Sequence, residues 1–413
     1  MGRRLALAVM ALLLVAAAPP GGVLPGRVLL VAPGPHAGER AQEALLDAKP
    51  GDTVRFAAGT FAFTTGLSLD VDGVTVEGAG PGRTILDFAG QEGAGEGLLI
   101  TSNRVLVRRL TIRDTRGDGI KSKGSDRISF QDLEVVWSGG PKPENGAYGV
   151  YPVASTNVLV ERVTVRGASD AGIYVGQSRN IIVRDSLAEF NVAGIEIENS
   201  MHADVTGNTV RHNTGGILVF DLPNLPQMGG HSTRVFANRV IDNDTPNFAP
   251  PGNIVASVPV GTGIMVMANR NVHVFGNEVS GNASAAFMVI AYSQPFESEG
   301  YNPLPRDVVV RENRVGRNGF APAFPGGPEI AAAVGGTLPP GLWDGVDRFT
   351  TAGREAREPV HVHFDVPAIS LNLGLAGAAP SAARPAPLAA PAAPPPPEPA
   401  PVTLPADQPG LAR

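Results

Sequence analysis

The sequence predicts an all-β solenoid, a parallel β-helix with coils of about 22 residues. The first observation is composition, because 51 Gly and 38 Pro in 413 residues would break most helices of ordinary length. The second is a small residue, usually Gly, that repeatedly precedes alternating apolar positions. The third is Asn, which recurs at fixed phases of the same repeat. Together they predict short strands with Gly or Asn corners, stacked coil on coil.

Two series of strands repeat along the chain. The first series begins at Gly119, Gly149, Gly172, Gly194, Gly216, Gly263 and Ala286. The second series carries an apolar residue at Val107, Phe130, Val160, Val183, Val205, Val235, Val274 and Val310. Strands of about five residues, three to a coil, would bury alternate side chains against the next coil.

Two columns of Asn follow the second strand series. One contains Asn208, Asn238, Asn277 and Asn313, and the other contains Asn191, Asn213, Asn243, Asn282 and Asn318. Asn tolerates left-handed backbone angles at a turn, and stacked amides can hydrogen-bond from one coil to the next. We therefore interpret these residues as structural ladders and not as ligand contacts.

The two ends of the chain differ from the repeat. Arg3 and Arg4 precede an apolar run and three small residues, which is the layout of a secretory signal peptide over residues 1–18. Residues 375–413 are dominated by Ala and Pro, and we expect a disordered or polyproline tail there. The predicted parts are a signal peptide (1–18), a lead-in or cap (19–49), the β-helix (50–320), an irregular segment with short strands (321–374) and the tail (375–413).

Composition and motifs exclude several classes of function. The net charge of −6, with both signs mixed along the chain, gives no nucleic-acid footprint. The absence of Cys excludes disulfides, thiolate metal sites and cysteine nucleophiles. No nucleotide-binding, haem-attachment or Gly-x-Ser-x-Gly motif is found, so no cofactor is expected. His361, His363 and Asp365 share one face of a strand, but we interpret them as a chance pair with a nearby acid and predict no metal site.

Several segments resemble known exported proteins. Gly51–Thr53 through Gly78–Thr84 is similar to the first coils of bacterial right-handed β-helix proteins. Gly146–Pro152, Gly167–Gly176 and Thr245–Asn253 resemble one exported family of parallel β-helix repeat proteins. This resemblance covers residues 50–320 and implies a right-handed helix, export to the periplasm or the medium, and frequent pairing with a second exported protein related to c-type cytochromes.

The resemblance to that family implies no reaction. A wider resemblance, resting on fold, is to carbohydrate-binding and sugar-hydrolase β-helices and to the accessory β-helix protein of nitrous oxide reductase maturation. After removal of the signal peptide, no membrane span is expected.

Insertions in the repeat indicate where the working face lies. They fall at residues 138–147, 221–231, 244–260 and 291–305, and they should form walls on both sides of the first strand series. On those strands the second and fourth residues after each Gly point outward. The second-position column is Lys121, Tyr151, Tyr174, Glu196, Leu218, Met265 and Met288. The fourth-position column is Lys123, Val153, Gly176, Glu198, Phe220, Met267 and Ile290.

One half of this face is polar. Glu196 and Glu198 lie about 6.6 Å apart by strand rise, which is typical of a solvated polar edge and also suits the general acid and base of an inverting glycosidase. Asp118 and Asp170 precede their strands and add carboxylates. The candidate catalytic residues are therefore Glu196, Glu198, Asp170 and Lys121.

Aromatic and basic side chains flank these carboxylates. Tyr151 and Tyr174 would stack on adjacent coils, either as a platform for a sugar ring or as ordinary sheet stabilisers. Lys121 and Lys123 would bind an acidic sugar, act as a base if desolvated, or be simply solvated.

The other half of the face is apolar, with Leu218, Phe220, Met265 and Met288 as candidate binding residues beside Met267 and Ile290. A patch of this kind is seldom left uncovered in a soluble monomer. Either the chain's own insertions fold over it, or a partner docks on Met265 and Met288. The sequence thus predicts an exported protein that binds a partner protein or a glycan, with a polysaccharide hydrolase, lyase or epimerase as the alternative.

Overall fold

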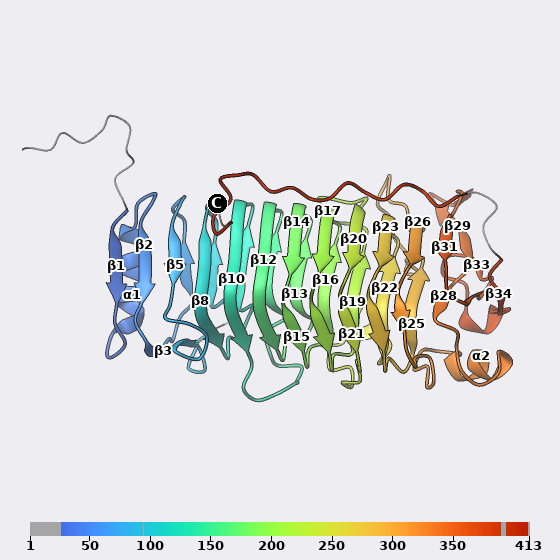
Figure 1. Cartoon of the computed structure of the whole chain (residues 1–413), viewed down its shortest axis with the longest axis horizontal. Coiled ribbons are helices and arrows are strands. Elements are labelled where there is room, and N and C mark those ends of the chain that lie inside the picture. Colours follow the sequence, from blue (N-terminus) through green and yellow to red (C-terminus); the bar gives the residue numbers. More distant parts are fainter. Residues whose placement is uncertain (1–25, 94, 390–393, 412–413) are drawn as a thin grey trace, which may run out of the picture.

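The structure, a computed structural model, describes residues 26–93, 95–389 and 394–411. The chain winds into one elongated rod whose coils lie side by side from β1 to β32 (Figure 1). The predicted signal peptide lies outside the described residues. Within the part of the chain that is described, no helix is long and apolar enough to cross a bilayer.

Two long sheets form the coils. The first, here the floor sheet, has twelve strands within the described ranges. They are β4 (Leu67–Leu69), β7 (Leu98–Ile100), β9 (Ile120–Lys123), β11 (Tyr148–Val153), β13 (Ala171–Gly176), β16 (Ala193–Glu198), β19 (Gly215–Phe220), β22 (Thr262–Met267), β25 (Ala285–Ile290), β28 (Gly341–Trp343), β32 (Ala368–Ser370) and β34 (Ala386–Pro387). The neighbours from β4 to β32 pair in parallel.

The second sheet, here the outer sheet, bends around the rest of each coil. Its strands are β1 (Val28–Val31), β2 (Thr53–Phe56), β3 (Gly59–Ala62), β5 (Thr75–Glu77), β6 (Thr84–Asp87), β8 (Leu106–Arg113), β10 (Asp126–Val136), β12 (Thr156–Arg166), β14 (Arg179–Arg184), β15 (Leu187–Glu189), β17 (Met201–Thr206), β18 (Thr209–Arg211), β20 (His231–Phe236), β21 (Arg239–Ile241), β23 (Arg270–Phe275), β24 (Glu278–Ser280), β26 (Arg306–Arg311), β27 (Arg314–Val315) and β31 (Val362–Phe364). From β14 onward a corner splits each long strand in two, at Asp185 and Ser186 in the first of these coils and at an Asn in the later ones, which gives the predicted three strands per coil.

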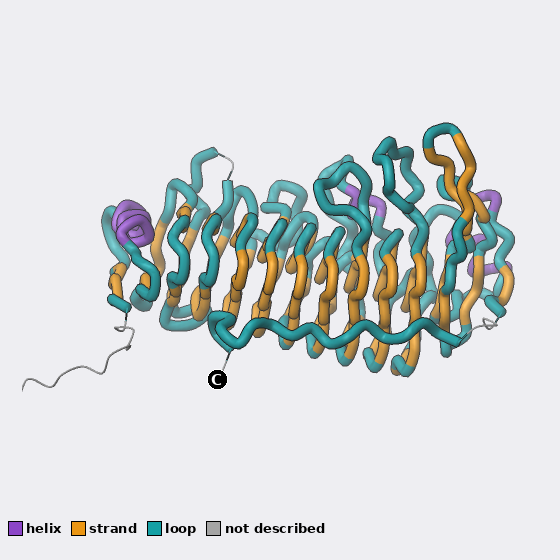
Figure 2. Tube along the Cα trace, turned by 90° about the horizontal axis from the view of Figure 1, so that it is seen from above, coloured by secondary structure: helices purple, strands orange, loops and turns teal. Residues whose placement is uncertain are grey.

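The remaining elements lie at the ends and in the insertions. They are the helices α1 (Ala37–Asp47) and α2 (Gly327–Ala333), the 3₁₀ turns Ile254–Ser257 and Pro380–Ala382, and a small sheet of β29 (Val346–Thr351), β30 (Arg354–Arg357) and β33 (Gly374–Leu375). Helix α1 closes the N-terminal end of the rod (Figure 2) by burying Ala41 and Leu45.

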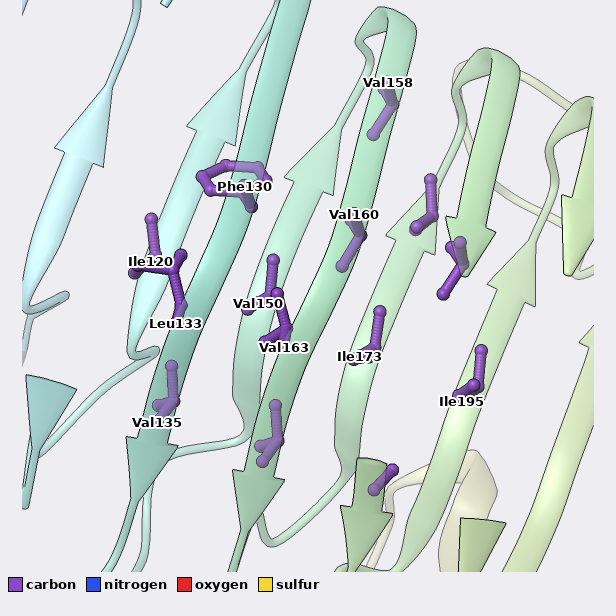
Figure 3. Close-up of a cluster of buried hydrophobic side chains, with 14 of the residues drawn as sticks. Ile120, Phe130, Leu133, Val135, Val150, Val158, Val160, Val163, Ile173 and Ile195 are labelled. Atoms are coloured by element: carbon purple, nitrogen blue, oxygen red, sulfur yellow. The ribbon is translucent and has the colours of Figure 1, made fainter. Parts of the chain in front are cut away.

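The interior is filled by columns of like side chains. Strand pairing places Val150 beside Ile173 and Ile173 beside Ile195, so each apolar residue packs on its counterpart one coil away. Phe130 and Val160 of the outer sheet face this column across the interior (Figure 3). Full burial of such residues in every coil supplies the hydrophobic stabilisation of the rod.

The Gly of the first strand series is required by a close approach to the opposite sheet. A Cβ built at Gly149 would lie 2.3 Å from Val165 Cγ1, and one at Gly194 would lie 2.3 Å from Val210 Cγ1. Neither distance leaves room for a methyl group. The repeat therefore uses Gly here for space and not for an unusual backbone angle.

The predicted Asn columns form continuous ladders. The Asn191 Nδ2 atom donates to Asn213 Oδ1 at 3.0 Å, and the Asn213 Nδ2 atom donates to Asn243 Oδ1 at 3.0 Å. Backbone amides take part in the same ladder of hydrogen bonds, because the backbone N–H of Asn191 also donates to Asn213 Oδ1 at 3.0 Å. The second column behaves alike from Asn208 to Asn313. Each buried Asn side chain thus provides a hydrogen-bond partner for the Asn of the next coil, as buried polar groups require.

The coils extend beyond the predicted range of residues 50–320 at both ends. Strand β1 already pairs in parallel with β2, and β31 and β32 continue the two sheets at the other end. The repeat pattern in the sequence does not reveal the late coils, because long connections interrupt them and because they lack the Gly and Asn signature.

Of the two expectations for the tail, disorder or polyproline, disorder is wrong for residues 394–411. This segment is extended and runs back along the outer sheet toward β10 (Figures 1 and 2). Composition alone predicted disorder because an Ala/Pro segment has no core of its own, but here the outer sheet supplies the surface that it packs on.

We predict that Asn213→Ala lowers the free energy of unfolding by about 3 kcal/mol, because it leaves the buried backbone N–H of Asn191 without its acceptor and removes one acceptor of the Asn191 side-chain amide. Urea denaturation followed by circular dichroism measures the change. Asn313→Ala, at the half-buried last position of the other ladder, is the matched control and should cost clearly less. Equal losses at the two positions would contradict a cooperative ladder.

Candidate functional site

The candidate site lies on the outward face of the floor sheet, between the walls formed by the insertions. Strand register sets Lys121 beside Tyr151, Tyr174 beside Glu196, and Glu196 beside Leu218. The next coils continue with Met265 and Met288. The face therefore changes from polar to apolar along the rod, in the order read from the sequence.

Three carboxyl groups gather at the centre of the polar half, and we call Asp170, Glu196 and Glu198 the carboxyl cluster. Their exposed fractions are 5%, 1% and 6%. The interpretation of Glu196 and Glu198 as a solvated edge is therefore wrong, because the insertions and neighbouring aromatic rings exclude water from them.

The members of the carboxyl cluster have different partners. The Tyr174 hydroxyl donates to Glu198 Oε1 at 2.6 Å. The side-chain amide of Asn253, from the insertion at 244–260, donates to Asp170 Oδ2 at 3.1 Å. Among the described residues, neither carboxyl oxygen of Glu196 has a hydrogen-bond partner. A buried carboxyl group in that state is costly unless it is protonated.

Burial raises the pKa of every member of the carboxyl cluster. Desolvation, followed by the charge of Glu198, raises the pKa of Asp170 to about 7. Desolvation also raises the pKa of Glu198 to about 7, although the Tyr174 hydrogen bond acts in the opposite direction. The pKa of Glu196 is raised well above its usual value by burial and by the two neighbouring acids. Near neutral pH the cluster therefore holds protons that ordinary carboxylates would have lost.

Three tyrosines pack beside the cluster. The ring centroids of Tyr148, Tyr151 and Tyr174 lie 4.4 to 4.9 Å apart. Tyr151 and Tyr174 meet edge to face at 84°, and Tyr174 is only 4% exposed. The expected flat platform of two stacked rings is therefore absent from this pair. Tyr148 and Tyr151 remain half-buried.

Lys121 is held by acids and by an aromatic ring. Its Nζ atom lies 3.0 Å from Glu96 Oε1, 3.4 Å from Asp118 Oδ2 and 4.7 Å from the centre of the Tyr151 ring. The acids outweigh the effect of burial, and the pKa of Lys121 is raised. It is therefore a cation near neutral pH, which opposes a role as a general base. Lys123, two residues further along β9, is exposed.

A cleft of about 530 Å³ opens beside the carboxyl cluster. Glu96, Arg116, Asp118, Asn145 and Asn253 contribute its polar lining. Asn253 also contacts Asp170, so the cleft reaches the edge of the cluster. Side chains of this kind bind hydroxyl-rich ligands, because they combine donors and acceptors with fixed positions.

The apolar half is covered by the chain itself. Leu218, Phe220, Met265 and Met288 are 0%, 1%, 3% and 5% exposed. Val255, Val258, Tyr301 and Ile330, from the insertions and α2, pack over them. The structure therefore favours self-covering over a partner docked on the two methionines. A cavity of about 270 Å³ remains between this cover and Met265, Met267 and Met288.

The histidines at the end of the rod are separate from this site. His361 is exposed, with its Nδ1 atom 2.9 Å from Asp307 Oδ1, whereas Asp365 accepts a hydrogen bond from the backbone of Glu312. His363 lies on β31 of the outer sheet.

Sequence reasoning missed several contributors to the site: Glu96, Arg116 and Asn145 in the cleft, and Tyr148 and Asn253 beside the carboxyl cluster. Tyr148 occupies the outward position immediately before the Gly column, where the other coils carry Ala171, Ala193, Gly215, Thr262 and Ala285. A large residue in a column of small ones was the available signal. No comparable signal exists for Asn253, because it lies in an insertion outside the repeat.

Comparison with known proteins supports the fold. Residues 96–249 match the family described as the right handed beta helix region. With the parallel register of both sheets, this match identifies a right-handed parallel β-helix. No curated protein matches the chain.

Several solved structures align with the chain at low identity and with TM-scores below 0.5. The mannuronan C-5 epimerase AlgE6 A-module of Azotobacter vinelandii is 14% identical, with a TM-score of 0.46 over 83% of this chain and 94% of that one. An alginate lyase from Paenibacillus sp. is 17% identical, with a TM-score of 0.36 over 71% and 97% of the two chains. These similarities concern fold alone.

We predict that the protein becomes less stable as the pH rises from 5 to 8. Asp170 and Glu198 have pKa values of about 7 in the folded chain, above their values in an unfolded chain, so the folded state binds more protons in this range. Glu198→Gln should reduce the loss of unfolding free energy between pH 5 and 8 by roughly 2 kcal/mol, measured by urea denaturation at each pH. Glu297→Gln, at an exposed position on a wall, is the control. Parallel pH profiles for parent and Glu198→Gln would contradict the raised pKa.

We predict that Met265→Asp lowers the melting temperature markedly, because the new carboxylate would be buried beneath the covering insertions. Differential scanning calorimetry measures the change. Met265→Leu, which retains the volume and the apolar character, should melt close to the parent. A normal melting temperature for Met265→Asp would show that the cover is open.

Proposed function

We propose that the protein binds a glycan in the polar half of the groove and hydrolyses it with the carboxyl cluster. The observation that carries this proposal is the gathering of three buried carboxyl groups with raised pKa values beside a polar cleft. Perturbed acids in a cleft are typical of catalytic sites, because proton transfer near neutral pH needs groups that titrate there.

The geometry suggests a role for each member. Asp170 reaches the cleft through Asn253 and is protonated below about pH 7, so it suits the acid that donates a proton to the glycosidic oxygen as the C–O bond breaks. Glu198 receives the Tyr174 hydrogen bond, which favours its ionised form, so it suits the base that takes a proton from the attacking water. Glu196 stays protonated and spares the site a third negative charge.

The polar rim would hold the sugar. Arg116 offers donors, Glu96 and Asp118 accept from sugar hydroxyls, and the half-buried Tyr151 beside Lys121 offers an aromatic ring. Lys121 keeps its charge and would attract a carboxylate-bearing sugar. Both neutral and uronate-containing polymers therefore belong in the first test.

The second candidate is a binding protein without turnover. The burial of the assigned acid and base favours it, since Asp170 and Glu198 are only 5% and 6% exposed and a carboxyl group that substrate cannot reach does no chemistry. In line with the predicted signal peptide, we place either activity in the periplasm or the medium. The cytochrome-related partner implied by the family resemblance stays a prediction, and it would need a surface other than the covered methionines.

A screen of the purified protein against neutral and uronate-rich polysaccharides, scoring binding and product release separately, tests the proposal. Asp170→Asn and Glu198→Gln should each reduce turnover by about 10²- to 10⁴-fold while changing binding less than tenfold. Tyr151→Ala should weaken binding by roughly 1 kcal/mol, and Glu297→Gln is the control. Binding without product release from every polymer would favour the second candidate, and undiminished turnover in Glu198→Gln would remove that residue from catalysis.

A further inference from the structure

A column of outward-pointing side chains on the outer sheet is buried, apart from the half-buried Ile182. Register aligns one residue of each coil from β10 to β26: Ser129, Leu159, Ile182, Asp204, Arg234, His273 and Val309. Their neighbours along each strand, such as Val158 and Val160, fill the interior, so this column points away from it. Nevertheless Leu159 is 0% exposed, and His273 and Val309 are each 2% exposed.

The C-terminal segment 394–411, which we call the strap, runs along this column (Figures 1 and 2). Its contacts begin at Glu398, whose carboxylate lies 2.8 Å from Arg234 Nη1 and 2.6 Å from Arg311 Nη2. Further along, the backbone N–H of Val402 donates to Asp204 Oδ2 at 3.1 Å. One acid of the strap thus joins two arginines that stand on different coils.

The far end of the strap is fixed by Gln408, which is 3% exposed. Its Nε2 atom lies 3.1 Å from Ile128 O, 2.9 Å from Ser129 Oγ and 3.1 Å from Asn157 O. Gln131 donates in return to the backbone oxygen of Gly410 at 3.1 Å. The nitrogen of one buried side-chain amide therefore contacts both β10 and β12.

Side chains, and not backbone pairing, decide what this surface accepts. Eight of the eighteen strap residues are Pro, which has no N–H to offer a sheet. Such a segment favours the extended polyproline conformation, so little entropy is lost when it is laid on a surface. Leu404 and Pro399 are buried between the polar anchors and add apolar contact.

We propose that this column is the floor of a peptide-binding groove for an extended, proline-rich segment, recognised by a glutamate at one end and a glutamine ten residues later. Its occupant is residues 394–411 of the same chain. The groove has the complementary chemistry: arginines at one end, an apolar middle, and a ring of backbone and hydroxyl acceptors at the other. It lies on the outer sheet, and the proposal does not depend on the function assigned to the floor sheet.

The test uses the full chain with a protease recognition sequence placed at residues 390–393. After cleavage the strap is held by the groove alone, and gel filtration at micromolar concentration shows whether it co-elutes with the rod. We expect co-elution for the parent sequence. The double variant Glu398→Gln, Gln408→Ala should release the strap at least tenfold more readily, and Thr403→Ala, at an exposed strap position, should retain it.

Circular dichroism of each uncut variant confirms that the rod is folded, which keeps release separate from unfolding. A synthetic 394–411 peptide added in excess should displace a fluorescently labelled cleaved strap, whereas a peptide with the same composition in scrambled order should not. Immediate loss of the parent strap after cleavage would overturn the proposal. Equal retention by the double variant would show that Glu398 and Gln408 do not determine recognition. Exchange of straps between two copies of the uncut chain would show that the occupant is not the strap of the same chain.

Discussion

The stacking of each coil on the next, strand for strand and without slippage, is the constraint on which the rest of the molecule depends. Because successive strands lie about 4.8 Å apart, a residue in one coil meets the same kind of residue in the next. Asn213 can accept from Asn191 only in this register. The same register brings Gly194 so close to Val210 that no side chain fits. A shift of one residue would turn every interior Val and Ile outward.

A framework this repetitive can support a costly cluster. Asp170, Glu196 and Glu198 are buried together, an arrangement that loses free energy through desolvation and mutual repulsion. Strand β16, which carries Glu196 and Glu198, is held on both sides by parallel neighbours with fully buried interiors. Stability supplied by the coils thus offsets strain placed on one face, as is common where a fold serves a chemical purpose.

The sequence was informative where residues repeat and uninformative where they do not. Gly172, Gly194 and the Asn columns defined the coils, and alternation then placed Tyr174, Glu196 and Glu198 on one face. Their burial could not be foreseen, because it depends on the path of the insertion that carries Asn253. The tail could not be foreseen either, since its order comes from arginines and carbonyl groups contributed by distant coils.

The length of the strap also limits the number of coils that can lie between its two contacts. Between its contacts at Glu398 and Gln408 it passes roughly four to five coils, about 22 Å, whereas ten residues in polyproline conformation reach about 31 Å. The slack is therefore smaller than two further coils. Duplication of one coil between the anchors would draw the strap nearly straight, and duplication of two would break one anchor unless the tail lengthened as well. In this way a peripheral segment limits how many repeats the solenoid can gain in its middle.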